Sequence, residues 1–234
     1  MKEIADGVFL LSGFPPAAFN VYLIRSGDET LLVDTSTRHA RRRILRQLKD
    51  PPTAIFITHA HRDHAGSMHS VAEATGAPVW SSHADADALE GKAPDPMPEQ
   101  YRGHVVNRMF AGWWKDFHPV SRRLHDGEQV AGFEVIAFPG HTPGMIGLWR
   151  ESDRTVLCAD VMRSVNLVTG LPQLGEMPVI FTCDVSEARS SIRKLAALEA
   201  NTICFGHGRP LTTNAAAKIT DFAADLPPEQ PTPP

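Results

Sequence analysis

Four potential metal ligands lie within six residues of this chain, directly after a short apolar run at 54–57 that is predicted to be a buried strand. They are His59, His61, Asp63 and His64. Residues two apart in an extended segment point the same way, so His59 and His61 can hold one ion together. Asp63 and His64 enter the following turn and point elsewhere, which suits a second ion beside the first. This spacing predicts metal binding at a junction between a strand and a helix.

Three more potential ligands also follow short apolar runs that we expect to form strands. They are His141 in the segment 138–144, Asp160 after 156–159 and His207 after 203–206. In α/β proteins, functional groups gather on loops at the ends of strands, above a rigid sheet. A histidine or aspartate at one such position is usually a loop residue or a cap. Together with the first motif, these three are predicted to complete a metal centre.

Composition is that of an ordinary globular protein. The chain has 234 residues, of which 42% are hydrophobic and 21% charged, and this excludes a disordered, collagen-like or coiled-coil protein. We expect one domain over residues 1–226 and a disordered Pro-rich tail at 227–234. The formal net charge of −4 argues against a nucleic-acid partner.

Neither a membrane span nor a secretory signal is expected. The sequence has no run of 18 apolar residues, which is about the minimum for a transmembrane helix. The first residues carry acidic side chains where a signal peptide needs basic ones followed by an apolar run. We therefore expect a cytoplasmic protein with a small-molecule substrate and no membrane partner.

Hydrophobic periodicity predicts two similar halves, each a sheet with helices. The expected strands are 8–11, 20–24, 30–34, 54–57, 79–80, 120–124, 128–138, 145–149, 154–159 and 202–205, and the expected helices are 38–49, 64–75, 186–199 and 214–225. Residues 91–118 are expected to be irregular. Two sheets packed face to face, with helices outside, would bury both faces of these apolar strands.

The set of His59, His61, Asp63, His64, His141, Asp160 and His207 resembles that of the metallo-β-lactamase superfamily. The resemblance covers nearly the whole chain and implies an α/β fold, a four-layer αββα sandwich. It also implies two metal sites, which share Asp160. The first would be held by His59, His61 and His141, and the second by Asp63, His64 and His207. The resemblance further implies that Asp34 supports the histidines from behind.

The resemblance and the ligand chemistry together predict a hydrolase. Imidazole and carboxylate ligands without thiolate suit two zinc ions per chain, and they also tolerate iron or manganese. Two such ions can share a hydroxide that attacks an ester, thioester or lactone carbonyl. Asp63 and Asp160 are the candidate catalytic carboxylates.

Several members of the superfamily remain as alternatives. Glyoxalase II enzymes have the same seven ligands but also a C-terminal helical domain, for which few residues remain after His207. N-acyl-homoserine lactonases resemble the run 139–144 but usually have a tyrosine where this chain has Arg163. A persulfide dioxygenase with one iron is the main alternative, although its usual Cys-Gly-Arg stretch is missing. A β-lactamase or a nuclease fits less well.

The sequence constrains the substrate pocket less than it constrains the metal centre. The aromatic residues Phe110, Trp113, Trp114 and Phe117 could form an apolar wall, or could simply dock a loop on the core. Arg163, three residues after Asp160, could bind a substrate carboxylate or phosphate, or could face solvent.

Overall fold

The structure is a computed structural model that describes two stretches of the chain, residues 1–101 and 116–228. The aromatic residues Phe110, Trp113 and Trp114 of the expected pocket wall lie outside these stretches, and so does most of the Pro-rich tail. No helix in the described stretches is long and apolar enough to cross a membrane.

The first sheet has seven strands, ordered in space as they are in the sequence. They are β1 (Lys2–Ala5), β2 (Val8–Leu10), β3 (Tyr22–Ser26), β4 (Glu29–Val33), β5 (Ala54–Phe56), β6 (Val79–Ser82) and β7 (Arg122–Leu124). Strands β1 to β4 pair antiparallel, whereas β4, β5, β6 and β7 pair parallel. The parallel part brings the carboxyl ends of β4, β5 and β6 to one edge.

The second sheet has five strands in the order β14-β11-β10-β9-β8. They are β8 (Gln129–Val130), β9 (Phe133–Ala137), β10 (Ile146–Arg150), β11 (Thr155–Ala159) and β14 (Thr202–Phe205). Only β11 and β14 pair parallel, and they bring Asp160 and His207 to the same edge. A separate hairpin pairs β12 (Arg163–Val165) with β13 (Pro172–Gly175).

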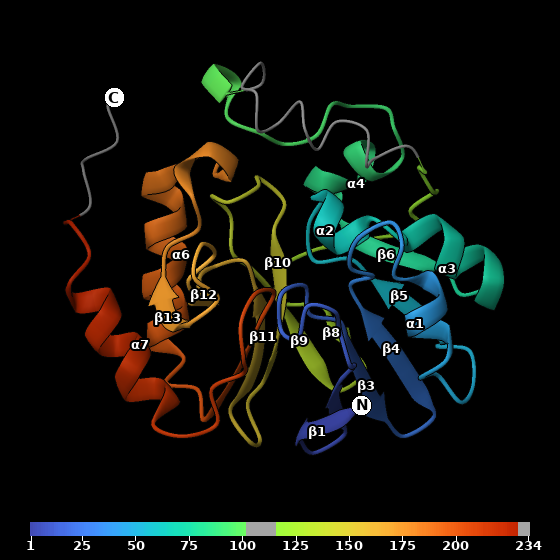
Figure 1. The fold of residues 1–234 in the computed structure, drawn as a ribbon, viewed down its shortest axis with the longest axis horizontal. Coiled ribbons are helices and arrows are strands. Elements are labelled where there is room, and N and C mark those ends of the chain that lie inside the picture. Colours follow the sequence, from blue (N-terminus) through green and yellow to red (C-terminus); the bar gives the residue numbers. More distant parts are fainter. Residues whose placement is uncertain (102–115, 229–234) are drawn as a thin grey trace.

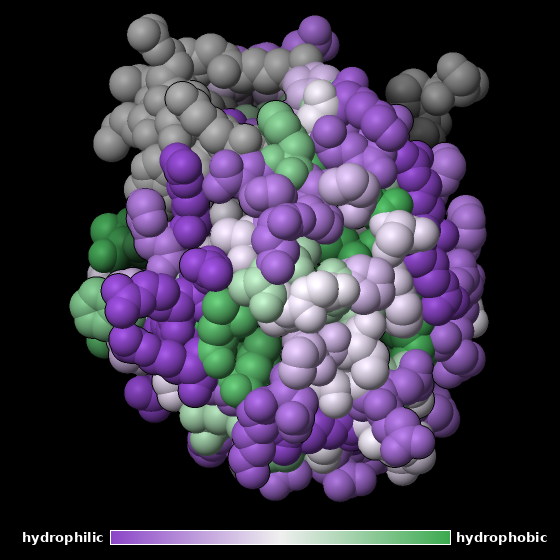
Figure 2. All heavy atoms as spheres, turned by 90° about the vertical axis from the view of Figure 1, so that its right-hand side faces the viewer, coloured by the Kyte–Doolittle hydropathy of each residue, from purple (hydrophilic) through white to green (hydrophobic). Residues whose placement is uncertain are grey.

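Helices cover the outer faces of the two sheets. They are α1 (Arg41–Leu45), α2 (Arg62–Ala65), α3 (Met68–Thr75), α4 (His83–Leu89), α6 (Val185–Ala197) and α7 (Ala215–Ala224), with short 3-10 turns at Glu99–Tyr101 and Val179–Phe181. Figure 1 shows α1 to α4 beside the first sheet and α6 and α7 beside the second, with the two sheets between them. Hydrophilic and intermediate side chains cover most of the outer surface on the side of α1 and α3 (Figure 2). The predicted four-layer αββα order is therefore present.

Alternation along the strands explains why both faces of each sheet are buried. In β4, Leu32 packs toward the helices of its own half, whereas Leu31 and Val33 pack between the sheets. In β11, Leu157 packs between the sheets and Val156 packs toward α6 and α7. Three apolar layers result, one between the sheets and one under each helical layer.

Three predicted elements differ in detail from the structure. The predicted helix 64–75 is two helices, because the Gly66 N–H donates to Ser36 O (2.9 Å) instead of continuing the helix. The predicted strand 128–138 is a hairpin, with positive φ angles at Ala131 (47°) and Gly132 (75°). Helix α1 is shorter than predicted, and β1, α4 and the β12–β13 hairpin were not predicted.

Candidate metal centre

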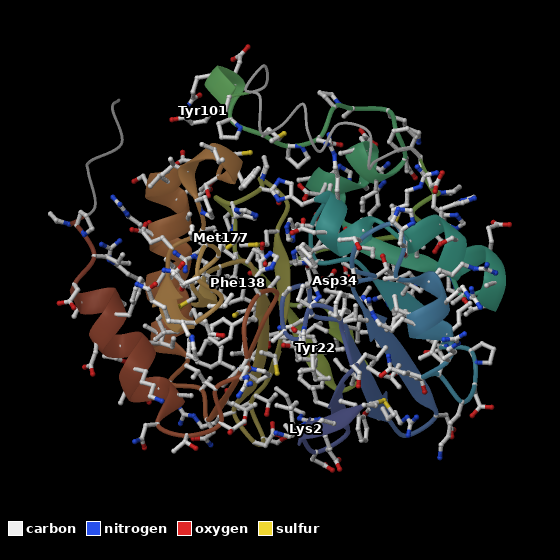
Figure 3. The ribbon with its side chains drawn as sticks, in the orientation of Figure 1. Lys2, Tyr22, Asp34, Tyr101, Phe138 and Met177 are labelled. Carbon is white, nitrogen blue, oxygen red and sulfur yellow. The ribbon has the colours of Figure 1, made fainter. Side chains whose placement is uncertain are left out.

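The first candidate ligands follow strand β5, which holds a buried position. Residues 54–60 are all buried, and His59 lies three residues after the end of β5. The Thr58 N–H donates to Asp34 Oδ1 (2.9 Å), and the Thr58 hydroxyl donates to the same carboxylate (2.9 Å to Oδ2). Asp34 itself follows β4, the parallel neighbour of β5, near the centre of the molecule (Figure 3). Two adjacent strand ends are thus joined just before the metal motif begins.

Three of the candidate ligands form what we call the three-histidine group, which consists of His59, His61 and His141. One nitrogen from each lies within 4.8 Å of the others, and His61 Nδ1 is 2.9 Å from His141 Nε2. His61 is the N-cap residue of α2, whereas His141 comes from the loop between β9 and β10. The tertiary fold therefore closes this group across the two sheets.

Each imidazole of the three-histidine group has a hydrogen-bond acceptor behind it. His59 Nδ1 lies 3.0 Å from Thr58 Oγ1, and His61 Nε2 lies 2.8 Å from Pro96 O. His141 Nδ1 lies 3.3 Å from Thr182 Oγ1, a hydroxyl that donates to Pro178 O. Because both hydroxyls already donate elsewhere, all three rings donate outward. The lone pairs of His59 Nε2, His61 Nδ1 and His141 Nε2 then point inward.

The other three ligands form the Asp-His-His group, which consists of Asp63, His64 and His207. Their ligand atoms also lie within 4.8 Å of one another, and His207 Nε2 is 3.3 Å from Asp63 Oδ2. His64 Nδ1 donates to Asp34 Oδ2 (2.7 Å), and His207 Nδ1 donates to Ala18 O. Both outer nitrogens are again donors, so both Nε2 atoms face the group.

Asp160 lies between the two groups. Its Oδ1 is 3.3 Å from His64 Nε2, and its Oδ2 is 3.1 Å from His207 Nε2 and 3.5 Å from His141 Nε2. The backbone beside it leaves no room for a side chain, because a Cβ on Gly206 would lie 2.0 Å from Asp160 Oδ1. One carboxylate therefore contacts ligand nitrogens of both groups.

Three buried atoms of the centre have no hydrogen-bond partner among the described residues. They are His59 Nε2, His64 Nε2 and Asp160 Oδ1. Leaving a buried polar atom unpaired is costly, and native proteins rarely do so. Imidazole nitrogens and a carboxylate oxygen, gathered and unpaired, are the donor set of a transition-metal site. The residues present therefore fit metal ions, and one ion in each group would give partners to all three atoms.

The two groups differ in their proton affinity. Burial lowers the pKa of His59 well below its ordinary value, and the charges of His64 and His61 add to this. Burial and the charge of His61 lower the pKa of His141 to about 3. His59 and His141 are thus neutral at neutral pH. Burial also acts to lower the pKa of His64, but the charges of Asp160 and Asp34 outweigh it and raise that pKa.

The same opposition of burial and charge governs the rest of the Asp-His-His group. For His207, the charge of Asp160 and the hydrogen bonds to Asp160 and Asp63 outweigh burial and raise the pKa to about 10. Burial acts to raise the pKa of Asp63, but the His207 hydrogen bond and the charge of His64 hold it below its usual range. Burial likewise opposes ionisation of Asp160, and the charges of His207 and His64 again prevail, so its pKa is lowered.

A third buried carboxylate, Asp85 on α4, supports the three-histidine group from outside. Asp85 Oδ2 accepts from the Ala60 N–H and from the Thr142 hydroxyl, each at 2.8 Å, and Oδ1 accepts from the Gly144 N–H at 2.8 Å. It therefore ties the segment between His59 and His61 to the loop of His141. Our sequence reasoning missed Asp85, Pro96 and Thr182, since none belongs to a local motif.

The described contacts of Arg163 and Phe117 lie outside the seven-residue set. The guanidinium of Arg163 turns into the β12–β13 hairpin, where Nε donates to Glu176 O (3.2 Å) and Nη1 donates to Val165 O (2.5 Å). Phe117 is 44% exposed, and its ring lies against Gly91. Trp113 and Trp114 lie outside the described residues. A role of these four residues in substrate binding stays a prediction.

Comparison with known proteins settles the family. The sequence profile of the metallo-beta-lactamase superfamily matches residues 16–207. The chain belongs to this superfamily. It is similar to the probable metallo-hydrolase YflN of Bacillus subtilis (strain 168), with 29% identity over 247 residues, 96% of this chain and 92% of that protein. It is also 25% identical, over 95% of its length and 68% of the relative, to the Beta-lactamase-like protein 2 homolog of Caenorhabditis elegans.

Solved structures of the superfamily share the fold. BJP-1, a subclass B3 metallo-beta-lactamase of Bradyrhizobium japonicum, matches 96% of this chain and 89% of its own, with a TM-score of 0.68 and 20% identity. TTHA1623 in a di-iron-bound form matches 90% of this chain and 96% of its own, with a TM-score of 0.65 and 23% identity. The expected fold is confirmed, and so is membership of a superfamily of metal-dependent hydrolases.

Proposed function

We propose that this protein is a dinuclear zinc hydrolase that cleaves the carbonyl of a small ester, thioester or lactone. One observation carries the proposal: all five imidazoles of the centre donate outward, so their inner nitrogens and the Asp160 carboxylate are available to cations. The three-histidine group would hold one ion and the Asp-His-His group the other, with Asp160 shared between them. Zinc suits this set because every ligand is an imidazole or a carboxylate.

When bound, divalent cations supply Lewis acidity, which polarises a carbonyl oxygen and lowers the pKa of water to about 7. The chain's own residues prepare for this chemistry in two ways. Thr58, Pro96 and Thr182 hold the rings of the three-histidine group in one tautomer and orientation. Asp34 and Asp85, both buried, hold the loops that carry the ligands.

Asp63 is the carboxylate best placed to orient the attacking water. Its side chain is 32% exposed, whereas that of Asp160 is 2% exposed, so a substrate can approach Asp63 from solvent. Its lowered pKa keeps it ionised at neutral pH, so its oxygens can accept a hydrogen bond from the attacking water and orient it. A carboxylate with so low a pKa is a weak base, so this role is one of positioning. Asp160, enclosed by ligand nitrogens, is suited to balance charge.

The proposal is tested by metal analysis and a substrate panel on the same preparation. We expect about two zinc ions per chain, together with hydrolysis of some members of a panel of thioesters, lactones, β-lactams and phosphodiesters. We expect the carbonyl compounds of the panel to be hydrolysed faster than the phosphodiesters. Iron is also tested, because a structural relative has been solved in a di-iron-bound form. One iron and no zinc, with oxygen consumption on a persulfide, would replace this proposal by a persulfide dioxygenase.

A further inference from the structure

A second cluster of metal-ligating side chains lies outside the seven-residue centre. His69 and Glu73 stand four residues apart on α3, so they share one face of that helix. His118 reaches them from the segment that leads into β7, where its backbone N–H donates to Leu89 O (3.2 Å). One ligand atom from each of the three side chains lies within 4.8 Å of the others.

The geometry of the two imidazoles matches that of a pair of ligands on one ion. His69 Nδ1 and His118 Nδ1 are 3.3 Å apart, and the rings are inclined at 58°. Zinc–nitrogen bonds of about 2.0–2.1 Å at a tetrahedral angle place two ligand nitrogens about 3.3 Å apart. The histidines are half-buried and Glu73 is exposed, so the cluster opens to solvent. It lies on the layer of α1 and α3, whose outer surface carries mostly hydrophilic and intermediate side chains (Figure 2).

We propose that His69, Glu73 and His118 form a separate binding site for a divalent transition-metal ion, with solvent completing the coordination. Two imidazoles and one carboxylate favour zinc, cobalt or nickel, whereas magnesium and calcium prefer sites made of oxygen ligands. The two histidines are 49 residues apart, so a bound ion cross-links α3 to the chain before β7. Such a link stabilises the folded state, because the ion binds only where the three ligands meet.

The other explanation of this contact is a hydrogen bond between two neutral imidazoles. A second histidine pair, His83 and His125, supplies the matched control. Its rings are stacked at 5.9 Å and 19°, and within the described residues it belongs to no cluster of three potential ligands. Loss of this pair removes two histidines without touching the proposed site.

The test compares zinc stoichiometry in the full-length protein and in three variants. The variants are His118→Ala, Glu73→Gln and the control His83→Ala/His125→Ala. We expect the unmodified protein and the control to bind one zinc more than His118→Ala does, as measured by calorimetric titration. Glu73→Gln should weaken that ion at least about tenfold, the lower limit for loss of a supporting group at a metal site. Glu73 is exposed, so this variant is expected to fold normally, and its melting temperature without metal checks this.

Added zinc should also raise the melting temperature of the unmodified protein and of the control by more than that of His118→Ala, in which only the seven-residue centre can bind it. Cobalt should reproduce the effect, and magnesium and calcium should not. Equal stoichiometry and equal melting shifts in all four proteins would overturn the proposal and leave the hydrogen bond. Failure of the proposed hydrolase would appear differently, as missing metal or activity in all four proteins alike.

Discussion

The three-histidine group and the Asp-His-His group present similar ligands in opposite electrostatic settings. Behind the first stand two hydroxyls and a carbonyl, and burial there lowers the pKa of His59 and of His141. Around the second stand the carboxylates Asp34, Asp63 and Asp160, which raise the pKa of its two histidines. The first group is thus ready to bind a cation, whereas the second must first release protons.

The largest effect is expected from a substitution that affects both groups at once. Asp160→Ala removes the only described carboxylate that contacts nitrogens of both groups, and two cations at short range would then repel with less compensation. We expect the turnover number to fall by about a hundredfold to a thousandfold, with loss of at least one metal ion. Steady-state kinetics and elemental analysis measure the two effects. Full activity with both ions retained would show that Asp160 is not shared.

Asp34→Asn should affect the Asp-His-His group more than the three-histidine group. Asp34 accepts the hydrogen bond from His64 but does not contact the three-histidine group directly. We expect the Asp-His-His group to lose metal affinity by about tenfold to a hundredfold, as carboxylate–histidine pairs do when the carboxylate is removed. Chelator competition measures this affinity.

Asp85→Asn is the matched control for that variant. It removes a buried carboxylate that braces the opposite group, through Ala60, Thr142 and Gly144. It should therefore weaken the three-histidine group and spare the other. Equal losses at both ions in both variants would show that the groups act as one unit.

The dependence of metal affinity on pH should distinguish the groups without any mutation. With a pKa raised to about 10, His207 carries a proton at neutral pH that an ion must displace. Affinity of the Asp-His-His group should therefore rise as the pH rises from 6 to 8, by roughly tenfold per unit for each proton displaced. His141, with a pKa of about 3, has no proton to lose in this range, so affinity of the three-histidine group should depend on pH less steeply. Competition titrations at several pH values check both slopes, and parallel slopes would contradict the comparison.

The smallest expected effect concerns a neutral support of the three-histidine group. Thr182→Val preserves the shape of the side chain but removes the acceptor behind His141 Nδ1. Loss of one neutral hydrogen bond costs about 1 kcal/mol, so affinity for that ion should fall about fivefold. The same titration at constant pH measures it. A loss as large as that of Asp34→Asn would mean that charge does not separate the supports of the two groups.

Local sequence determined the elements that begin and carry the centre. The pattern from His59 to His64, and the polar residues that end the predicted strands at His141, Asp160 and His207, depend on short-range periodicity and on strand termination. Both are properties of neighbouring residues, so they can be read from the chain directly. The order of strands and helices also implied two sheets packed between two helical layers.

Tertiary structure alone decided which atoms support and which atoms face the centre. Pro96 and Thr182 lie 35 and 41 residues from the histidines that they contact, and Asp85 lies 25 residues from Ala60. The His69–His118 contact spans 49 residues. Arg163, although only three residues from Asp160, turns into its own hairpin because backbone carbonyls there accept its donors. Hydrogen-bond direction depends on where the folded backbone places each acceptor. Side-chain periodicity carries no such information. The sequence therefore identified the candidate ligands, whereas the packing of distant loops determined their orientation and charge.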